Sequence, residues 1–157
     1  FVQYLPGSLS SKDRGQHLPA TRISDYMSHY GILSGKLDAS LAFYKDILGF
    51  KETWRGGRDS TLNWVNVQVP DGDDYIELML YSELPGETKR GSQHHICLFV
   101  PDIEKAKAAL EQRGGYTRPL EIRTGINRRR QMNLFDPDGK LVARASATQA
   151  PKPFKRF

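Results

Sequence analysis

Apolar and polar residues alternate and then switch to helical spacing twice along the chain. The stretch "SHYGILSGKLDASLAFYKDILGF", residues 28–50, predicts a strand followed by a helix that ends before Gly49. The stretch "HHICLFVPDIEKAKAALEQRGG", residues 94–115, repeats this order, with Asp102 at the start of the helix. Three strand-like stretches follow each helix. Each half of the chain is therefore predicted to be a β-α-β-β-β unit.

The two halves keep an almost constant offset. His29 and His95 are 66 residues apart, and the two "PDG" turns are 67 residues apart. The offset of 66 also aligns Glu77 with Ala143. A constant offset indicates a structural repeat. We therefore predict an α+β fold in which two tandem β-α-β-β-β modules form a half-open mixed β-barrel around a concave pocket.

The repeat divides the chain into three parts. Residues 1–25 are expected to be an N-terminal extension or a linker from a longer chain, because no strong pattern begins there and the chain does not start with methionine. The repeat occupies residues 26–146, with modules at 26–82 and 93–146. Residues 147–157 are expected to form a basic, proline-containing tail.

Composition limits the classes of protein to which the chain can belong. With 157 residues and 38% hydrophobic content, it can bury one ordinary core. No apolar run approaches the length of a membrane span, so we expect a soluble chain without a membrane partner, either cytoplasmic or exported as a processed form. Lys152, Lys155 and Arg156 account for three of the five net positive charges, and we therefore expect no nucleic-acid partner.

Period-two alternation predicts which side chains share a face of the sheet. The fully apolar face of each first strand is expected to pack against a helix, which leaves His29, Glu77 and His95 on the opposite, concave face. The third strands add further side chains to that face: Trp64, Asn66, Arg129, Gln131 and Asn133. Because polar groups are costly to bury without a partner, this face predicts a hydrated or ligand-binding pocket.

These features resemble the vicinal oxygen chelate superfamily, which includes glyoxalases, methylmalonyl-CoA epimerases, extradiol dioxygenases, and fosfomycin- and bleomycin-resistance proteins. The resemblance rests on "LDASLAFYKDILGF", "DPDGK", the paired halves, and the residues His29, Glu77 and His95. It implies a metal site with one ligand from the first and the last strand of each module. Ala143 then occupies the fourth position, where alanine cannot bind a metal.

The resemblance implies a divalent metal cofactor. Two imidazoles and one carboxylate with open coordination positions favour Fe(II), and also suit Zn, Mn, Ni or Co. With Ala143 in place of the carboxylate that moves the substrate proton in the related lyases, we slightly favour an extradiol-type dioxygenase acting on a small oxygenated substrate. Two alternatives stay open: a glyoxalase-like lyase or isomerase, and a non-catalytic module, either ligand-binding (resistance-type) or structural, whose metal site has decayed.

Several residues are expected to surround a small-molecule substrate: Trp64, Asn66, Arg129, Gln131 and Asn133. The forked guanidinium of Arg129 is expected to pair with an anionic group at the edge of the pocket, with a solvated loop as the alternative. His94 is expected to cap the outer edge or meet solvent. Cys97 is expected to be a buried thiol, not a nucleophile.

The association of the modules stays open between a homodimer and contact with a module that precedes Phe1. The linker "SELPGETKRGSQ" has 12 residues, which is long enough for the two modules to come together within one chain. We therefore expect a site that is complete in one chain.

Overall fold

The fold is α+β with a mixed sheet. The computed structural model describes residues 5–13, 15–70, 72–90, 93–113, 116, 118–135 and 141–147, with residues 10, 11 and 142–147 described by their backbone alone. The elements are, in chain order, α1 (Leu9–Lys12), β1 (Tyr26–Ser34), α2 (Leu37–Leu41), the π-helix η1 (Ala42–Ile47), β2 (Lys51–Arg58), β3 (Thr61–Gln68), β4 (Tyr75–Leu80), α3 (Glu87–Arg90), β5 (His95–Phe99), α4 (Ile103–Arg113), β6 (Ile122–Thr124), β7 (Arg130–Phe135) and β8 (Leu141–Ala147). The β-α-β-β-β order occurs twice, from β1 to β4 and from β5 to β8.

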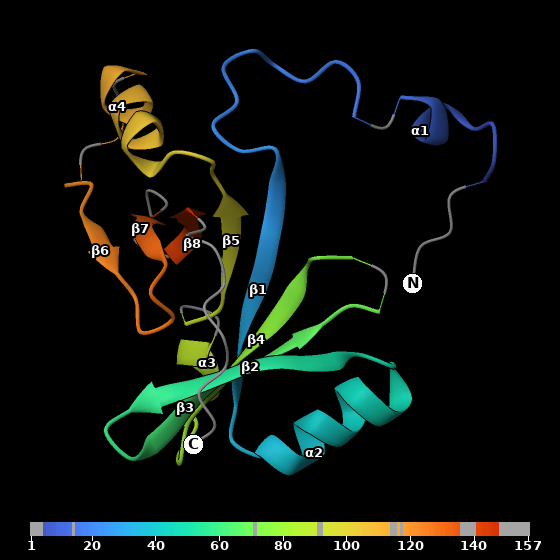
Figure 1. Cartoon of the computed structure of the whole chain (residues 1–157), viewed down its shortest axis with the longest axis vertical. Helices are drawn as coiled ribbons and strands as arrows, with labels where there is room; N and C mark the ends of the chain where they lie inside the picture. Colours follow the sequence, from blue (N-terminus) through green and yellow to red (C-terminus); the bar gives the residue numbers. More distant parts are fainter. Residues whose placement is uncertain are drawn as a thin grey trace.

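One eight-stranded sheet joins the two modules in the order β2-β3-β4-β1-β5-β8-β7-β6. At its centre β1 and β5 run antiparallel beside each other (Figure 1). Each of them pairs in parallel with the last strand of its own module, β1 with β4 and β5 with β8. The first and last strands of both modules are therefore the four central strands. β2 and β6 are the edges of the sheet, and among the described residues no pairing joins them.

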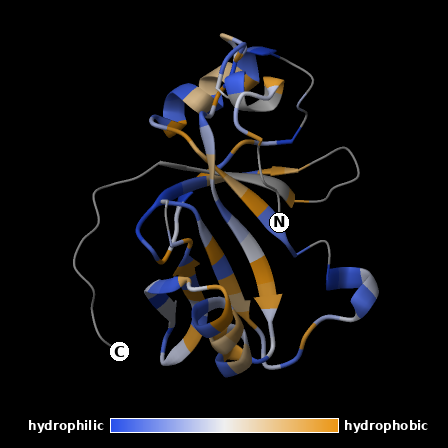
Figure 2. Ribbon diagram, turned by 90° about the vertical axis from the view of Figure 1, so that its right-hand side faces the viewer, coloured by the Kyte–Doolittle hydropathy of each residue, from blue (hydrophilic) through white to orange (hydrophobic). Residues whose placement is uncertain are grey.

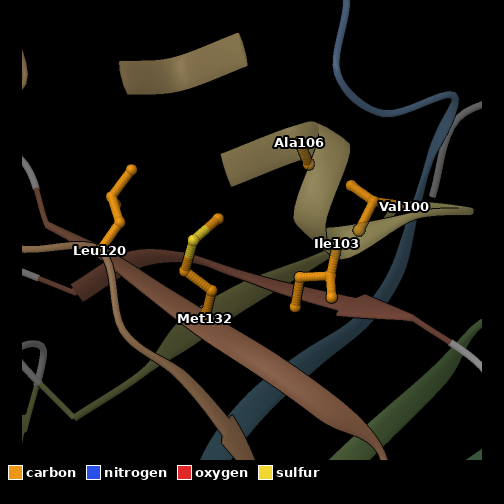
Figure 3. Close-up of a cluster of buried hydrophobic side chains, with 5 residues drawn as sticks. All are labelled: Val100, Ile103, Ala106, Leu120 and Met132. Atoms are coloured by element: carbon orange, nitrogen blue, oxygen red, sulfur yellow. The ribbon is translucent and has the colours of Figure 1, made fainter. Parts of the chain in front are cut away.

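Helix α4 covers the second module. Its first turn is capped by Asp102, whose Oδ1 accepts hydrogen bonds from the backbone N–H groups of Lys105 and Glu104, and these bonds lower the pKa of the carboxyl group. One face of α4 buries apolar side chains against β7 and β8 (Figure 3). The cluster consists of Val100, Ile103, Ala106, Leu120 and Met132.

The helix of the first module differs from the expected regular helix. After α2, the chain continues directly as the π-helical η1, and Gly49 ends it with a φ of 74°. The wider π turns move side chains away from the 3.6-residue period, and Phe43 and Ile47 are exposed. Strand residues nearby are fully buried, including Val65 and Val67, which were expected on the apolar face.

Hydropathy follows the two faces of the sheet. Hydrophobic and hydrophilic stretches succeed one another along the long strands (Figure 2), as expected for strands with one packed and one polar face. No helix among the described residues is long and apolar enough to cross a membrane. The predicted basic tail lies, from residue 148 onward, outside the described residues, and the other proposed domain boundaries stay predictions.

Candidate metal centre

Three buried side chains from three adjacent central strands converge. His29 lies on β1, Glu77 on β4 and His95 on β5, and none of them is more than 4% exposed. Their potential ligand atoms all lie within 4.8 Å of one another. The Nε2 atoms of His29 and His95 are 3.4 Å apart, and Nε2 of His95 is 3.8 Å from Oε1 of Glu77. The three residues predicted to share the concave face are thus brought together within one chain.

The spacing of the three side chains fits a single divalent ion. Two ligands bound at about 2.1 Å and at angles of about 90–110° are separated by about 3.0–3.4 Å, so the observed 3.4 and 3.8 Å require only a small contraction. Two imidazoles and one carboxylate are a donor set suited to Fe(II), and other divalent ions accept it as well. The group could therefore bind a divalent metal, whose identity the geometry leaves open.

Asn66 supplies a second sign of fit. It pairs directly with Glu77 between β3 and β4, so the two side chains lie on the same face of the sheet. The side-chain oxygen Oδ1 of Asn66 is buried, and no donor among the described residues hydrogen-bonds to it. A buried acceptor without a donor is rare in native proteins, and a metal ion or its bound water next to Glu77 would satisfy it.

Gly31 makes the convergence sterically feasible. It pairs with Glu77 in β4 on one side and with His95 in β5 on the other. A Cβ atom at this position would lie 2.2 Å from Cε1 and 2.8 Å from Nε2 of His95. The lack of a side chain therefore lets the His95 imidazole lie across β1, where it can approach His29 and Glu77.

A hydrogen-bond chain fixes the tautomer of His29. The Ser28 hydroxyl donates to the carbonyl oxygen of Cys97 at 3.3 Å, and Oγ of Ser28 lies 3.3 Å from Nδ1 of His29. Because the hydroxyl hydrogen is used on Cys97, the second contact requires Nδ1–H of His29 as the donor. Nε2 then carries the lone pair that a metal needs, on the side that faces His95.

Ser28→Ala is expected to weaken Zn(II) binding by about tenfold, because it removes the group that holds the Nδ1–H tautomer of His29. Calorimetric titration of metal-free protein measures this effect. Ser24→Ala is the matched control, because Ser24 bonds only to backbone carbonyl groups near the end of β5 and the start of β1. Equal affinities for the two variants would show that Ser28 does not orient the ligand.

Tyr75 packs against the metal site from behind. Its ring stacks on the His29 imidazole, with centroids 4.6 Å apart and planes inclined by 25°. Burial raises the pKa of the Tyr75 hydroxyl, which therefore stays protonated at neutral pH. Nη1 of Arg129 donates a hydrogen bond of 2.7 Å to this hydroxyl oxygen. Arg129 thus holds Tyr75, and Tyr75 in turn limits the movement of His29.

This position of Arg129 differs from the predicted one. Arg129 was expected at the edge of the pocket, yet it does not line the cavity. It precedes β7, which begins at Arg130, and Arg128 has a φ of 58°. The left-handed residue interrupts the strand alternation on which the expectation depended.

A cavity of about 1230 Å³ opens beside the candidate metal centre. Glu77 and His95 line it, together with Trp64, Gln131 and Asn133, which were predicted as substrate contacts. Asn66 lies next to Glu77 but does not line this cavity. Whether these residues bind a substrate stays a prediction. The position of the cavity nevertheless gives a ligand direct access to two of the three metal-binding side chains.

The fourth ligand position is Arg144 and not Ala143 in the observed register. Glu77 pairs with Gly31 and Asn66, and in the second module Arg144 pairs with Cys97 and Asn133. Cys97 and Asn133 are the repeat counterparts of Gly31 and Asn66, at offsets of 66 and 67. The extra residue seen at the second turn therefore persists into β8. Neither alanine nor arginine supplies a carboxylate, so the absence of a fourth protein ligand holds in both alignments.

Sequence reasoning assigned no role to Ser28 or Tyr75 and gave Gly31 only a place on the concave face. A glycine inside a strand that otherwise alternates is a known signal of close approach, and it could have identified Gly31. His94 is half-buried, with its ring 6.2 Å from that of Tyr30, outside the metal-binding group. Cys97 is buried, as expected.

Comparison with known proteins follows the same pattern. Residues 26–143 match the family model of the Glyoxalase/Bleomycin resistance protein/Dioxygenase superfamily. The uncharacterized protein YwbC of Bacillus subtilis (strain 168) is 31% identical over 120 residues, which cover 74% of this chain and 93% of YwbC. The uncharacterized protein YaeR of Escherichia coli (strain K12) is 32% identical over 118 residues, which cover 71% of this chain and 88% of YaeR.

Solved structures share the fold. Methylmalonyl-CoA epimerase from Mycobacterium tuberculosis superposes with a TM-score of 0.64 at 20% sequence identity. The match covers 87% of this chain and 95% of that chain. At this identity the likeness concerns the arrangement of the two modules, not the reaction.

Proposed function

Because the chain belongs to the glyoxalase/bleomycin resistance protein/dioxygenase superfamily, we propose that it is a metal-dependent enzyme that opens the ring of a small catechol-like substrate with O₂. The observation that carries the proposal is the buried group of His29, Glu77 and His95 beside the cavity. Three protein ligands on one side of an ion leave positions through which two neighbouring substrate oxygens and O₂ can bind. The divalent ion would supply Lewis acidity and a site for O₂.

The charged residues near the site favour oxygen chemistry over proton transfer. Among the described residues that line the cavity, the carboxylates are Glu77 and Glu121. Glu77 belongs to the metal-binding group, and the exposed Glu121 is paired with Arg123. No second carboxylate among these residues is placed to take a proton from a metal-bound substrate, and an epimerase or glyoxalase reaction needs such a base.

The protein's own groups would orient the substrate. Glu77 and His95 fix the ion at the inner end of the cavity, while Trp64 offers a flat surface for a ring. The side-chain amides of Gln131 and Asn133 also line the cavity and can hydrogen-bond to substrate oxygens. This arrangement selects a planar molecule with two adjacent oxygen atoms at one end.

The proposal is tested by elemental analysis and oxygen uptake. Protein purified without added metal is expected to contain near-stoichiometric iron and to consume one O₂ per catechol, with both oxygen atoms entering the ring-opened product and no external reductant. Resorcinol, whose hydroxyl groups are not adjacent, is the matched control and should cause no uptake. Iron without uptake would overturn the dioxygenase reaction, zinc or nickel would favour a lyase or isomerase, and absence of any bound metal would favour a non-catalytic module.

A further inference from the structure

The cavity is lined by more positive than negative side chains. Its charged lining residues are Arg58, Arg118, Arg123, Glu77 and Glu121. Glu77 belongs to the metal-binding group, and Arg123 is paired with Glu121. Arg58 and Arg118 form no salt bridge with any carboxylate in the part of the chain that the structure describes. Two guanidinium groups are therefore left to compensate a charge that enters the cavity.

Each of these guanidinium groups is supported by an aromatic ring that also lines the cavity. The Cζ atom of Arg58 lies 5.6 Å from the ring centroid of Trp64, and that of Arg118 lies 5.0 Å from the ring centroid of Phe135. Such cation–π contacts hold a guanidinium in place while its N–H donors stay accessible. Arg58 ends β2 in the first module, whereas Arg118 precedes β6 in the second, so the pair spans both modules.

The backbone that carries Arg58 is tightly constrained. Its N–H donates a 2.9 Å hydrogen bond to Oδ1 of Asn63 across the β2–β3 hairpin. At Gly57 an added Cβ would lie 1.7 Å from the carbonyl oxygen of Thr61, so this tight hairpin requires glycine there. Arg58 is consequently presented from a defined hairpin and not from a loose loop.

The depth of the cavity separates these arginines from the metal ligands. Glu77 and His95 are buried, whereas Arg58 and Arg118 are exposed and therefore lie at the mouth. Typical small-molecule sites occupy roughly 300–1,000 Å³, and the volume of about 1230 Å³ exceeds what a bare catechol needs. The space admits a longer ligand whose two ends meet different chemistry.

We propose that Arg58 and Arg118 form an anion clamp at the mouth of the cavity, which selects substrates with a carboxylate or a phosphate at the end opposite the oxygen pair. This inference rests on the proposed function for the orientation of the substrate, but not for the existence of the clamp. Forked guanidinium donors match the oxygen geometry of both anions. The clamp replaces Arg129 as the anion-recognising element.

Matched probes test the clamp. The first pair is 3-(3,4-dihydroxyphenyl)propanoate and its neutral amide, which differ only in the charged group. A third probe, the corresponding phosphonate, distinguishes a carboxylate site from a phosphate site by relative affinity. The two tryptophans of the chain, Trp54 and Trp64, both line the cavity, so quenching of intrinsic fluorescence reports binding in metal-free and in zinc-loaded protein.

The carboxylate probe is expected to bind about tenfold tighter than the amide, and the preference should weaken at high salt because exposed charges are screened. The double variant Arg58→Gln/Arg118→Gln should lose the preference. Arg123→Gln, which removes a lining arginine that already has a carboxylate partner, should keep it. Equal binding of the acid and the amide by the unmodified protein, or a preference that survives in the double variant, overturns the clamp.

The two proposals fail in different ways. If the protein binds no metal, the proposed function falls, yet the acid-over-amide preference in metal-free protein still decides the clamp. If metal binds and catechols are oxidised while the double variant keeps its charge preference, the clamp falls and the proposed function stands. Circular dichroism of the double variant verifies folding, which exposed substitutions are expected to preserve.

Discussion

Gly31→Ala is expected to weaken Zn(II) binding by roughly 100-fold or more, nearly as much as direct removal of a ligand by His95→Ala. The added Cβ would overlap the His95 imidazole, and its three nearest heavy atoms are all in that ring. The ring must therefore turn away from His29 and Glu77. Calorimetric titration of metal-free protein with Zn(II) measures the loss.

The same substitution should leave the fold intact, because the clash involves the end of a rotatable side chain and not the backbone. We expect the free energy of unfolding to change by less than about 1 kcal/mol, since alanine is also a better strand residue than glycine. Gly86→Ala is the control, because no atom lies within 4 Å of a Cβ added there. Parent-like affinity in Gly31→Ala would mean that His95 does not bind the metal from its observed position.

The candidate site was predictable from sequence to the extent that it depends on alternation along strands. Side chains two residues apart share a face whatever the rest of the fold does, so His29, Glu77 and His95 could be assigned to one surface before their distances were known. Their convergence was less accessible to sequence reasoning. It depends on Gly31, which lies between Glu77 and His95 in the sheet, and on lateral pairing that one sequence does not reveal.

The incorrect expectations have local causes. The histidine pair gave an offset of 66 for the whole repeat, whereas the pairing of Asn133 with Arg144 preserves the 67 found at the turns. One residue is enough to exchange the two faces of β8. The π-helix η1 also escaped prediction, because the 3.6-residue pattern of its apolar residues does not distinguish it from a regular helix.

Arg144→Glu is expected to strengthen metal binding, because it places a carboxylate at the register position equivalent to Glu77. The second-module neighbours repeat those of the first: Asn133 pairs with residue 144 as Asn66 pairs with Glu77. The substitution also removes a positive charge near the ion. A fourth protein ligand should raise Zn(II) affinity by about tenfold or more and shift preference toward ions that accept four protein ligands, such as Zn or Ni.

Ala143→Glu separates this prediction from a general effect of added negative charge. Ala143 pairs with Ile96 and Leu134, so its place in the register corresponds to Ile76 and not to Glu77. We therefore expect Ala143→Glu to leave metal affinity near that of the parent and to lower the midpoint of thermal unfolding, while Arg144→Glu does the reverse for affinity. In the Arg144→Glu variant an occupied fourth position should also slow any O₂ uptake, since one open site is lost. If Ala143→Glu binds zinc more tightly than Arg144→Glu, the observed register of β8 is wrong by one residue and the fourth position belongs to Ala143.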